Sequence, residues 1–510
     1  MSQTASLAWL AAHEFRLGWR DWVAMMTAGH RRRLRNVAIA LIIFAGFMHL
    51  LAYSMVGRYA HAGVVPDKAT LVVVTGTMLL SWSLLLSQAM ESVTRAFYSR
   101  SDLDLILTSP ISPRRIFTVR IGRIAVTVAV MAMLLAAPFI DVMAFFDGAR
   151  WLAGYGVVAA MGAVAAALAV ALTVALFRTI GAKRTRLIAQ IVAAVIGAAF
   201  VIGLQVAAIL SYGSLSRFAP LQSEWLIAHA PDVGSAVWWP ARAVLGDPAA
   251  LVLVAAISLT LLGSAMLIFS ARFGDHVVAA AGVSQSVVRQ RRWAQGFRRR
   301  SPSRALRHKE WALLARDPWL MSQTLMQILY LLPPALLLWR SFHSGTGAFV
   351  VLVPVIVMAA GQLGGGLAWL TISGEDAPDL VATAPITARR ILWAKIEAVM
   401  GAIVFVFAPL IVALAFAAPW PAIVAGAGVL IGAAAATFVQ LCFRSQARRS
   451  QFRRRQVSSR IATFAEAFSS ISWAATAALA VAGSWLTIVA AAMALGVLAG
   501  ARAISPRRLD

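Results

Sequence analysis

The sequence predicts an all-α polytopic membrane protein with about 12 transmembrane helices, arranged as two tandem six-helix halves that each follow an amphipathic interfacial helix. Three observations lead to this fold class. Hydrophobic residues make up 60% of the 510 residues and the mean hydropathy is +0.78, which leaves too little polar surface for a water-soluble domain. Apolar runs of roughly 20 residues, the length that spans a bilayer, recur along the chain. A short polar stretch also occurs twice, far apart.

The repeated stretch is polar and basic, and it follows the second apolar run of each predicted half. Residues 101–120 read SDLDLILTSPISPRRIFTVR, and residues 374–395 read GEDAPDLVATAPITARRILWAK. With Pro110 aligned to Pro385, the residues in register are Asp104/Asp379, Leu105/Leu380, Ile111/Ile386, Ser112/Thr387, Arg114/Arg389, Arg115/Arg390, Ile116/Ile391 and Arg120/Lys395. This correspondence predicts a tandem duplication, with a first half at 1–272, a basic cytoplasmic linker at 273–302 and a second half at 303–510.

Each copy of this stretch predicts a short helix, a sharp break and a new helix. Acidic residues lie at the start of the short helix, where the helix dipole favours negative charge, and they are Asp102 and Asp104 in one copy and Glu375, Asp376 and Asp379 in the other. Proline then ends the short helix. Ser112 or Thr387 is placed to cap the next helix, which has Pro113 at its first position in the first copy. Paired arginines precede the following apolar run, so we expect a hairpin at the cytoplasmic surface.

An amphipathic helix is predicted before each half. Residues 3–26 alternate apolar and charged side chains at helical spacing, and a basic run at 30–35 follows them. The spacing of the charged residues Glu14, Arg20 and Asp21 recurs downstream in Glu310, Arg316 and Asp317. A helix of this kind lies in the membrane interface, with its apolar side in the bilayer and its charged side in water.

The first half contains six apolar runs that are long enough to cross a bilayer. They cover about residues 36–56, 69–90, 121–146, 151–177, 187–210 and 249–270. Arginine and lysine are concentrated after the second and fourth runs, so the positive-inside rule places these loops and both chain termini in the cytoplasm. The segment 211–247 is then outside, and its tryptophans and prolines predict a short structure against the outer membrane face.

The second half repeats this order with the same orientation. Its apolar runs cover about residues 323–340, 348–372, 393–418, 421–443, 461–482 and 485–503. A strongly basic loop at 444–460 follows the fourth run, as in the first half. Six runs in each half bring the chain back to the side on which it began, which explains why the two halves share one orientation.

Charge and motif content exclude several classes of function. The net charge is +26, but the arginines cluster beside the ends of apolar runs, which indicates topology and lipid contact and argues against nucleic-acid binding. A single cysteine, Cys442, excludes an internal disulfide and a cysteine-rich metal site. No Gly-Lys dipeptide occurs, so the phosphate-binding loop of ATPases is missing. We therefore expect no catalytic, cofactor or metal site in this chain, and no enzyme activity of its own.

Titratable side chains within the apolar runs are few. His49 lies in the first run, where a packing or pore-lining role is favoured over metal ligation. Asp141 lies in the third run, and a carboxylate facing the outer surface is favoured there over a functional intramembrane acid. Glu397 and Glu466 lie near cytoplasmic helix ends and are assigned no role. No convincing set of groups for proton coupling emerges, so we expect energy to enter from the cytoplasmic side.

Taken in this order, the elements resemble the membrane subunits of ATP-binding-cassette exporters of the ABC-2 type. The resemblance rests on an amphipathic interfacial helix, two spans, a hairpin of the form Asp-Leu-x4-Pro-Ile-Ser/Thr-x-Arg-Arg, and four more spans, found twice. Members of that family commonly have one six-span unit per chain and pair two of them. The resemblance covers essentially the whole sequence and implies that two such units are fused here.

The resemblance implies a permease that exports an unidentified substrate across the inner membrane, driven by ATP and Mg on a separate cytoplasmic ATPase subunit, of which two copies are expected. The hairpins would be the coupling helices that dock into that ATPase, and the interfacial helices around Glu14 and Glu310 would touch it as well. The implied coupling residues are Asp102, Asp104, Leu105, Pro110, Ser112, Arg114 and Arg115 in the first half, and Asp376, Asp379, Leu380, Pro385, Thr387, Arg389 and Arg390 in the second.

In the family, the second and fifth spans line the transport path. This would place Ser83, Ser87 and Gln88 of the first half and Gln362 of the second half on the path. Ordinary hydrogen bonding between helices explains the same four residues equally well. Gly361 and Gly365, four positions apart, are expected to let helices pack closely.

Two other classes of function stay open. The first is a secondary active transporter with two six-span repeats; the amphipathic helix before each half argues against it, and transport driven by an ion gradient without an ATPase would favour it. The second is a membrane scaffold or an integral membrane enzyme. An enzyme would need catalytic residues clustered at one membrane face, and the sequence contains no such cluster.

Overall fold

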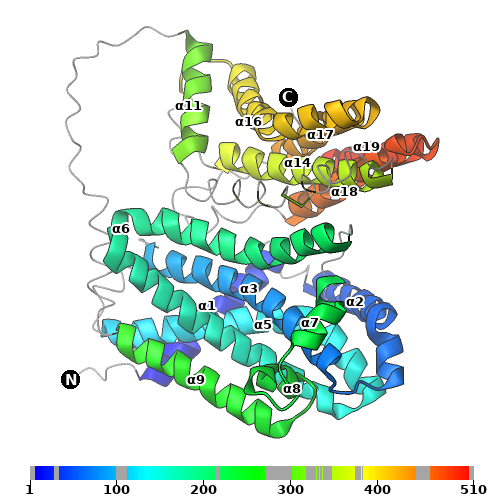
Figure 1. Ribbon diagram of the computed structural model, residues 1–510. Coiled ribbons are helices and arrows are strands. Elements are labelled where there is room, and N and C mark those ends of the chain that lie inside the picture. The colour runs from blue at the N-terminus through cyan, green and yellow to red at the C-terminus, as the bar shows by residue number, and fades with distance from the viewer. Residues whose placement is uncertain are drawn as a thin grey trace. The chain divides into compact units, whose positions relative to one another are not determined.

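The computed structural model describes most of the chain as helices (Figure 1). The described residues are 6–27, 34–98, 112–212, 219–270, 301–316, 347–373, 383–443 and 460–504, with six single residues between 325 and 381. The chain forms two compact units, one of Met1–Leu204 with Ser216–Val287 and the other of Gln205–Leu215 with Val288–Asp510. No strand occurs among the residues that are described, so the prediction of an all-α fold is confirmed for them.

Ten helices among the described residues are long and apolar enough to cross a membrane. They are Lys68–Phe97, Arg114–Asp147, Ala149–Gly181, Leu187–Leu210, Pro248–Ser270, Phe349–Ile372, Ala388–Ala417, Pro419–Cys442, Ala462–Val481 and Leu486–Ala503. A shorter apolar helix, Leu41–Gly57, matches the predicted first span. The predicted span at 323–340 lies almost entirely outside the described residues. The chain is a helical membrane protein, and the count of twelve spans stays a prediction.

The described residues of the first unit form six long helices and a group of short ones. The long helices are α1 (Leu7–Thr27), α2 (Leu34–Ala62), α3 (Lys68–Tyr98), α5 (Pro113–Asp147), α6 (Ala153–Tyr212) and α9 (Pro248–Ser270). A buried cluster joins α3, α5 and α6, with α9 packed against it, and Phe97 of α3 is its aromatic centre. The ring centroid of Phe97 lies 6.1 Å from that of Phe117 and 5.3 Å from that of Phe177.

Helix α6 contains the two predicted spans 151–177 and 187–210, which the structure gives as Ala149–Gly181 and Leu187–Leu210. Two helices meet here at a kink at Gly181, where φ is 74° and ψ is 162°. The expected basic loop at 178–186 is helical apart from this kink. Glycine adopts this positive φ without a steric cost, so the chain can change direction between the two helices at this residue. The last turns of α6, from Gln205 to Tyr212, belong to the second unit.

The segment between α6 and α9 forms the short structure that its tryptophans and prolines predict. It contains η3 (Ala219–Gln222), α7 (Glu224–His229), η4 (Ala236–Trp238) and α8 (Trp239–Val244). The indole of Trp238 is buried (4% exposed) and donates hydrogen bonds to the carbonyl oxygens of Pro231 (3.3 Å) and Asp232 (3.1 Å). The Lys68 ammonium lies 3.0 Å from the Asp232 carboxylate, so the segment is fastened to the start of α3.

Asp247 caps the start of α9. One carboxylate oxygen accepts hydrogen bonds from the backbone amides of Ala249 (3.0 Å) and Ala250 (3.2 Å), and the other lies 2.7 Å from the guanidinium of Arg242. The hydrogen bond from the Ala250 amide is the largest cause that lowers the pKa of Asp247 below its usual value, and the charge of Arg242 lowers it further. The pKa of this carboxylate is therefore lower in the folded state than in the unfolded state, where it is about 4. Its contribution to stability is complete above the unfolded-state pKa and is lost as the pH falls through the folded-state pKa.

We therefore expect Asp247→Ala to lower the free energy of unfolding by about 1 kcal/mol near neutral pH, because the first amides of α9 lose their acceptor. Asp247→Asn keeps an acceptor oxygen and loses the titrating charge. Residue 247 should therefore no longer contribute to the loss of stability of the protein at acidic pH. Thermal unfolding of the purified protein at pH values from neutral to acidic checks both variants. Equal acid sensitivity of wild type and Asp247→Asn would contradict the assignment.

The second unit is a bundle with a crosswise helix at one end. Its helices are α11 (Pro302–Arg316), α14 (Gly347–Ser373), α16 (Ala388–Ala417), α17 (Pro419–Cys442), α18 (Arg460–Val481) and α19 (Leu486–Ile504). Helix α14 is central and packs against α16, α17 and α18, and α19 lies against α18. Figure 1 shows α11 running crosswise to α14. A single core of aliphatic residues with Phe349 and Phe407 joins α14, α16 and α17.

Candidate coupling site

Helix α11 is attached to α16 by an ion pair at its exposed side. The guanidinium of Arg307 meets the carboxylate of Glu397 through two atom pairs, Nε to Oε2 at 2.5 Å and Nη2 to Oε1 at 3.0 Å. Two parallel bonds fix both position and orientation. About half of each side chain is exposed (57% and 44%), so solvent screening keeps the contribution of this pair to stability small. Glu397, to which we had assigned no role, thus binds α11, the predicted interfacial helix.

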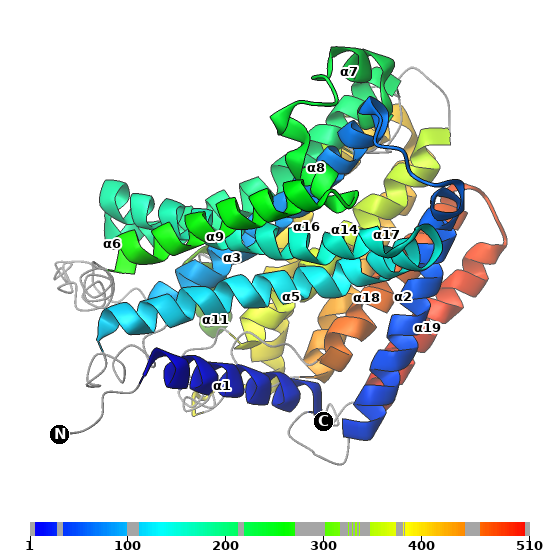
Figure 2. The same ribbon diagram turned by 90° about the horizontal axis from the view of Figure 1, so that it is seen from below.

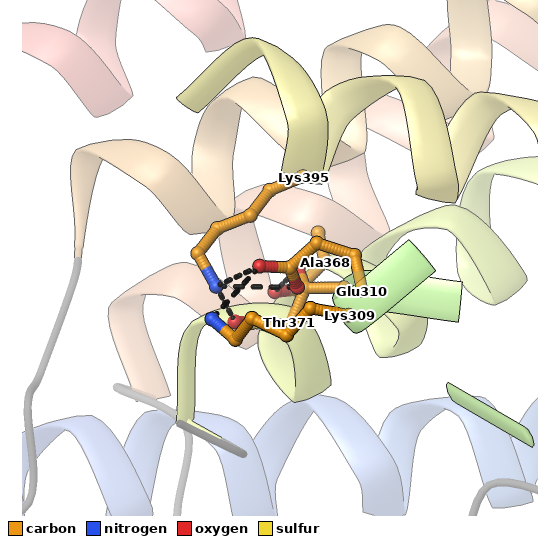
Figure 3. Close-up of polar contacts among 5 residues, drawn as sticks. All are labelled: Lys309, Glu310, Ala368, Thr371 and Lys395. Carbon is orange, nitrogen blue, oxygen red and sulfur yellow. Dashed lines mark hydrogen bonds and ion pairs between the residues drawn. The ribbon is translucent and has the colours of Figure 1, made fainter. Parts of the chain in front are cut away.

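A second ion pair, one turn further along α11, is buried. The side chain of Glu310 has no exposed surface (0%), and its carboxylate lies 3.2 Å from the ammonium groups of both Lys395 and Lys309. Figure 3 shows Lys395 pointing from α16 toward Glu310 and toward Thr371, near the end of α14. The Lys395 ammonium also donates a hydrogen bond to the Thr371 carbonyl oxygen. Lys395 therefore connects α11, α14 and α16 at one point.

Apolar contacts complete the attachment of α11. Leu314 is part of the core that surrounds α14, and Leu306 is likewise buried (6% and 7% exposed). Trp311 lies against Gly401 of α16, where an added Cβ atom would be 2.9 Å from the indole ring. Because two ion pairs and the contact of Trp311 join α11 to α16, the two helices are expected to move together as a rigid pair.

The first unit contains a related set of contacts. Figure 2 shows α1 lying beside α5, and the Glu14 carboxylate of α1 lies 3.0 Å from the guanidinium of Arg123 on α5. Arg120, one turn earlier on α5, donates a hydrogen bond to the Ala96 carbonyl oxygen near the end of α3 (3.5 Å). In each unit a glutamate of the predicted interfacial helix therefore pairs with a basic residue of the helix that follows the predicted hairpin.

The contacts to the helix before the hairpin also occupy corresponding positions. Arg120 and Lys395 are 275 positions apart, as are the residues that accept their hydrogen bonds, Ala96 and Thr371. The same spacing separates Pro110 from Pro385. The two units differ in the glutamate contact, because Lys395 makes both contacts in the second unit, whereas Arg120 and Arg123 divide them in the first.

Much of the hairpin itself lies outside the described residues, including Asp102, Asp104, Leu105 and Pro110 in the first copy and Asp376, Asp379 and Leu380 in the second. Ser112 and Thr387 occupy the N-cap positions of α5 and α16, as predicted, with extended backbone conformations. Neither side chain accepts a capping hydrogen bond, so the prediction that these hydroxyl groups cap the helices is wrong. Pro113 in the first copy still starts the helix with a fixed φ.

The remaining predicted coupling residues are on the surface of their units. The described side chains in this group are all exposed, namely Arg114, Arg115, Pro385, Arg389, Arg390 and Arg20. The backbones of Asp21 and Arg316 are helical, and Asp317 lies outside the described residues. Exposed arginines at the starts of α5 and α16 leave these helix ends able to contact an acidic partner.

The four predicted path residues fall into two groups. Ser83 is buried and donates a hydrogen bond to the Leu80 carbonyl oxygen of its own helix (2.8 Å). Ser87 lies against Gly197 of α6, where an added Cβ atom would be 2.9 Å from its Oγ atom. Gln88 and Gln362 are exposed on their units. The two serines thus fit the interpretation as helix-packing residues, and the two glutamines stay candidates for the path.

The second and fifth predicted spans pack together in the second unit through polar side chains. Ser470 of α18 lies against Gly361 of α14, where an added Cβ atom would be 2.5 Å from its Oγ atom, and the carboxyl group of Glu466 fills the place of a Cβ at Gly365. Gln440 of α17 donates a hydrogen bond to the Glu466 carboxylate (2.6 Å). The expected close packing at the two glycines is confirmed.

The structure also brings together groups inside the membrane that the sequence analysis did not connect. Glu466 bonds to Gln440 instead of reaching the interface, and Asp141 bonds to His49 and Tyr155 instead of standing alone at the outer surface. The absence of a set of groups for proton coupling stays a prediction, because hydrogen bonds alone do not show coupling. The sequence signal was weak, because the partners are 92 and 14 positions apart around Asp141 and 26 positions apart around Glu466.

Comparisons with protein families, with curated proteins and with solved structures find no match to this chain. The function is therefore argued from the geometry of these sites and from the sequence pattern.

Proposed function

We propose that this chain is the permease subunit of an ATP-binding-cassette exporter, in which a separate cytoplasmic ATPase subunit supplies the energy. In this proposal the chain has twelve spans in two fused halves and lies in the inner membrane with both termini in the cytoplasm. ATP and Mg bind to the ATPase, and the permease contributes no catalytic residue. Two ATPase copies serve one chain, because each half presents one hairpin.

The observation that carries the proposal is the repeated connection around the two hairpins. In both units a basic side chain of the helix after the hairpin bonds to a carbonyl oxygen of the helix before it, through Arg120 with Ala96 and Lys395 with Thr371. In both units an interfacial glutamate also pairs with that following helix. Together these contacts form a joint between the interfacial helix and the two helices on either side of the hairpin, and this joint occurs in both units.

This joint gives a mechanical reason for the assignment. A force applied to the hairpin passes directly into α5 or α16, because both helices begin three residues after the hairpin proline. The ion pairs carry the same displacement to α1 or α11. Closure of two ATPases on ATP would then tilt both sets of helices, and a pathway between the halves would change from inward to outward access.

Copurification from native membranes tests the proposal. We expect an ATPase to copurify in stoichiometric amount with the tagged chain in mild detergent. Asp104→Lys and Asp379→Lys should each weaken its association by about tenfold, equivalent to about 1.4 kcal/mol, and the double variant should lose it. Glu224→Lys, on an exposed residue of α7, serves as the matched control and should retain it. Recovery of the chain alone under several mild conditions would contradict the proposal.

A second candidate is a secondary active transporter, and the intramembrane bonds of Glu466 and Asp141 favour it. It predicts transport in sealed vesicles that stops when an ionophore collapses the ion gradient and that needs no ATP. The ATPase proposal predicts the opposite for both treatments.

A further inference from the structure

Three side chains from three helices of the first unit meet inside the membrane-spanning region. His49 lies within the apolar part of α2, Asp141 is six residues before the end of α5, and Tyr155 is near the start of α6. The Asp141 carboxyl group is the centre of the group. Its Oδ2 atom lies 3.2 Å from Nε2 of His49, and its Oδ1 atom accepts a hydrogen bond from the Tyr155 hydroxyl (2.7 Å).

The hydrogen bonds of His49 determine how many protons the group holds. Nδ1 of His49 lies 2.7 Å from the Ala45 carbonyl oxygen. A carbonyl oxygen can only accept, so Nδ1 carries a hydrogen. If His49 is neutral, Nε2 then has a lone pair and must accept a hydrogen bond, which an ionised carboxylate cannot donate. The observed 3.2 Å contact therefore requires one further proton, either on Nε2 or on the Asp141 carboxyl group.

The two arrangements of this proton have the same total charge. A charged imidazolium beside a carboxylate and a neutral imidazole beside a carboxylic acid are both neutral as a pair. Without the proton, the pair has a net charge of −1 and two lone pairs face each other. A net charge inside the membrane is costly, so the pair without its proton is unfavourable in this geometry.

We propose that His49 and Asp141 form a binding site for one proton in the membrane part of the first unit, with Tyr155 holding the carboxyl group in place. The site requires no metal or cofactor. Its side chains are about 40% exposed on the surface of the unit (41% for His49 and 43% for Asp141). Asp141 also lies about 9 Å from the end of its helix. A proton can therefore exchange without unfolding of the helices.

No other ionisable side chain among the described residues bonds to these three. Those on the surrounding helices have partners elsewhere or lie apart, namely Asp147 with Arg150, Glu14 with Arg123, Glu91 with Arg95, Lys68 with Asp232, and Tyr53 and His61 beside Phe146. Helix α9, which packs against α5, contains no ionisable residue. The proton affinity is therefore set by the group itself.

Proton release would have a structural consequence. The contact between Nε2 of His49 and Asp141 is a polar link between α2 and α5, and it becomes repulsive when the proton leaves. Helix α2 is expected to move away from α5 in the deprotonated state. The proposal is independent of the energy source, because either an ATPase-driven permease or a secondary transporter could contain this proton site.

The substitution Asp141→Asn offers a variant that should fold. The asparagine Oδ1 atom can accept the Tyr155 hydroxyl, and its Nδ2 group can donate to Nε2 of a neutral His49, while Nδ1 still donates to Ala45. Every hydrogen bond is kept without the extra proton. The variant therefore separates loss of the proton from loss of the contacts.

Protonation of His49 in the purified full-length protein tests the proposal. Nitrogen-15 NMR of histidine-labelled protein distinguishes an imidazolium from each neutral tautomer, and the His49 signal is assigned by its absence from His49→Gln. At neutral pH we expect either an imidazolium in the wild type or an infrared carboxylic-acid band that Asp141→Asn lacks. In Asp141→Asn, His49 should be neutral with hydrogen on Nδ1. A neutral His49 beside an ionised Asp141 in the wild type would overturn the proposal.

Tyr155→Phe gives a second test, in which the pH of proton release is measured. A contact with a purely structural role would leave this pH unchanged. The Tyr155 hydroxyl stabilises the uncompensated negative charge that Asp141 has after the proton leaves, so its removal should make the pair hold the proton more strongly. The pH at which the proton leaves should rise by about one unit, a tenfold change in proton affinity. An unchanged or lower pH of release would also count against the site.

Discussion

Replacing Lys395 with methionine should lower the free energy of unfolding of the second unit by about 3 kcal/mol, because it leaves a buried carboxylate without its main partner. Glu310 has no exposed surface. Among the residues that the structure describes, Lys309, the adjacent residue on the same helix, would still lie near it, at 3.2 Å. The Thr371 carbonyl oxygen would also lose its hydrogen bond from Lys395. Chemical or thermal unfolding of the purified protein in detergent provides the measurement.

Two controls distinguish a buried ion pair from a general effect of charge removal. Arg307→Met breaks the exposed pair with Glu397 on the same two helices, and we expect a loss of no more than about 1 kcal/mol. The double substitution Glu310→Met with Lys395→Met removes both buried charges, so it should recover most of the stability that Lys395→Met loses. Equal losses for Arg307→Met and Lys395→Met would contradict the claim that the buried Glu310 depends more on its partner than the exposed Glu397 does.

Gly365→Ala is expected to destabilise the second unit by about 3 kcal/mol, at the upper end of the usual cost of overpacking. A Cβ atom at this position would overlap the carboxyl group of Glu466. The glutamate would then have to leave its place beside Gln440, which donates to it at 2.6 Å. A charged side chain displaced within a helix bundle has few places where it can be solvated.

The neighbouring glycine is a matched control. A Cβ atom at Gly366 meets nothing within 4 Å, so Gly366→Ala should change stability by no more than about 0.5 kcal/mol. The double variant Gly365→Ala with Glu466→Ala should be more stable than the sum of the single effects predicts, because the two residues compete for one space. Equal tolerance of alanine at 365 and 366 would contradict the close approach of α14 and α18 at Gly365.

Helix positions followed well from the sequence, because the length of an apolar run that fits a bilayer is a local property. The predicted spans 348–372, 461–482 and 485–503 differ from the bounds of α14, α18 and α19 by one residue at each end. The kink in α6 did not follow. Basic residues at 178–186 indicated a loop, but most of them are also good helix formers, and a single glycine was enough to change direction.

The sequence predicted where the candidate coupling site lies, and it did not predict which residues make contact there. The duplicated proline and arginine pattern identified where the two hairpins connect to α5 and α16. It did not indicate that Lys395 would bond to Glu310, 85 positions earlier, or that Glu397 would hold Arg307, 90 positions earlier. The two N-cap residues were found by their type and position, yet their hydroxyl groups do not cap.

The sequence by itself determined that this protein is helical, belongs in a membrane and repeats one polar pattern, since hydropathy, proline and charge act on neighbouring residues. Only the tertiary structure decided which charged and polar groups share a site. Glu310 with Lys395, Glu466 with Gln440, and His49 with Asp141 each join different helices. Whether such groups meet depends on how closely those helices pack, and packing is set by small residues such as Gly365 that carry no chemical signal of their own.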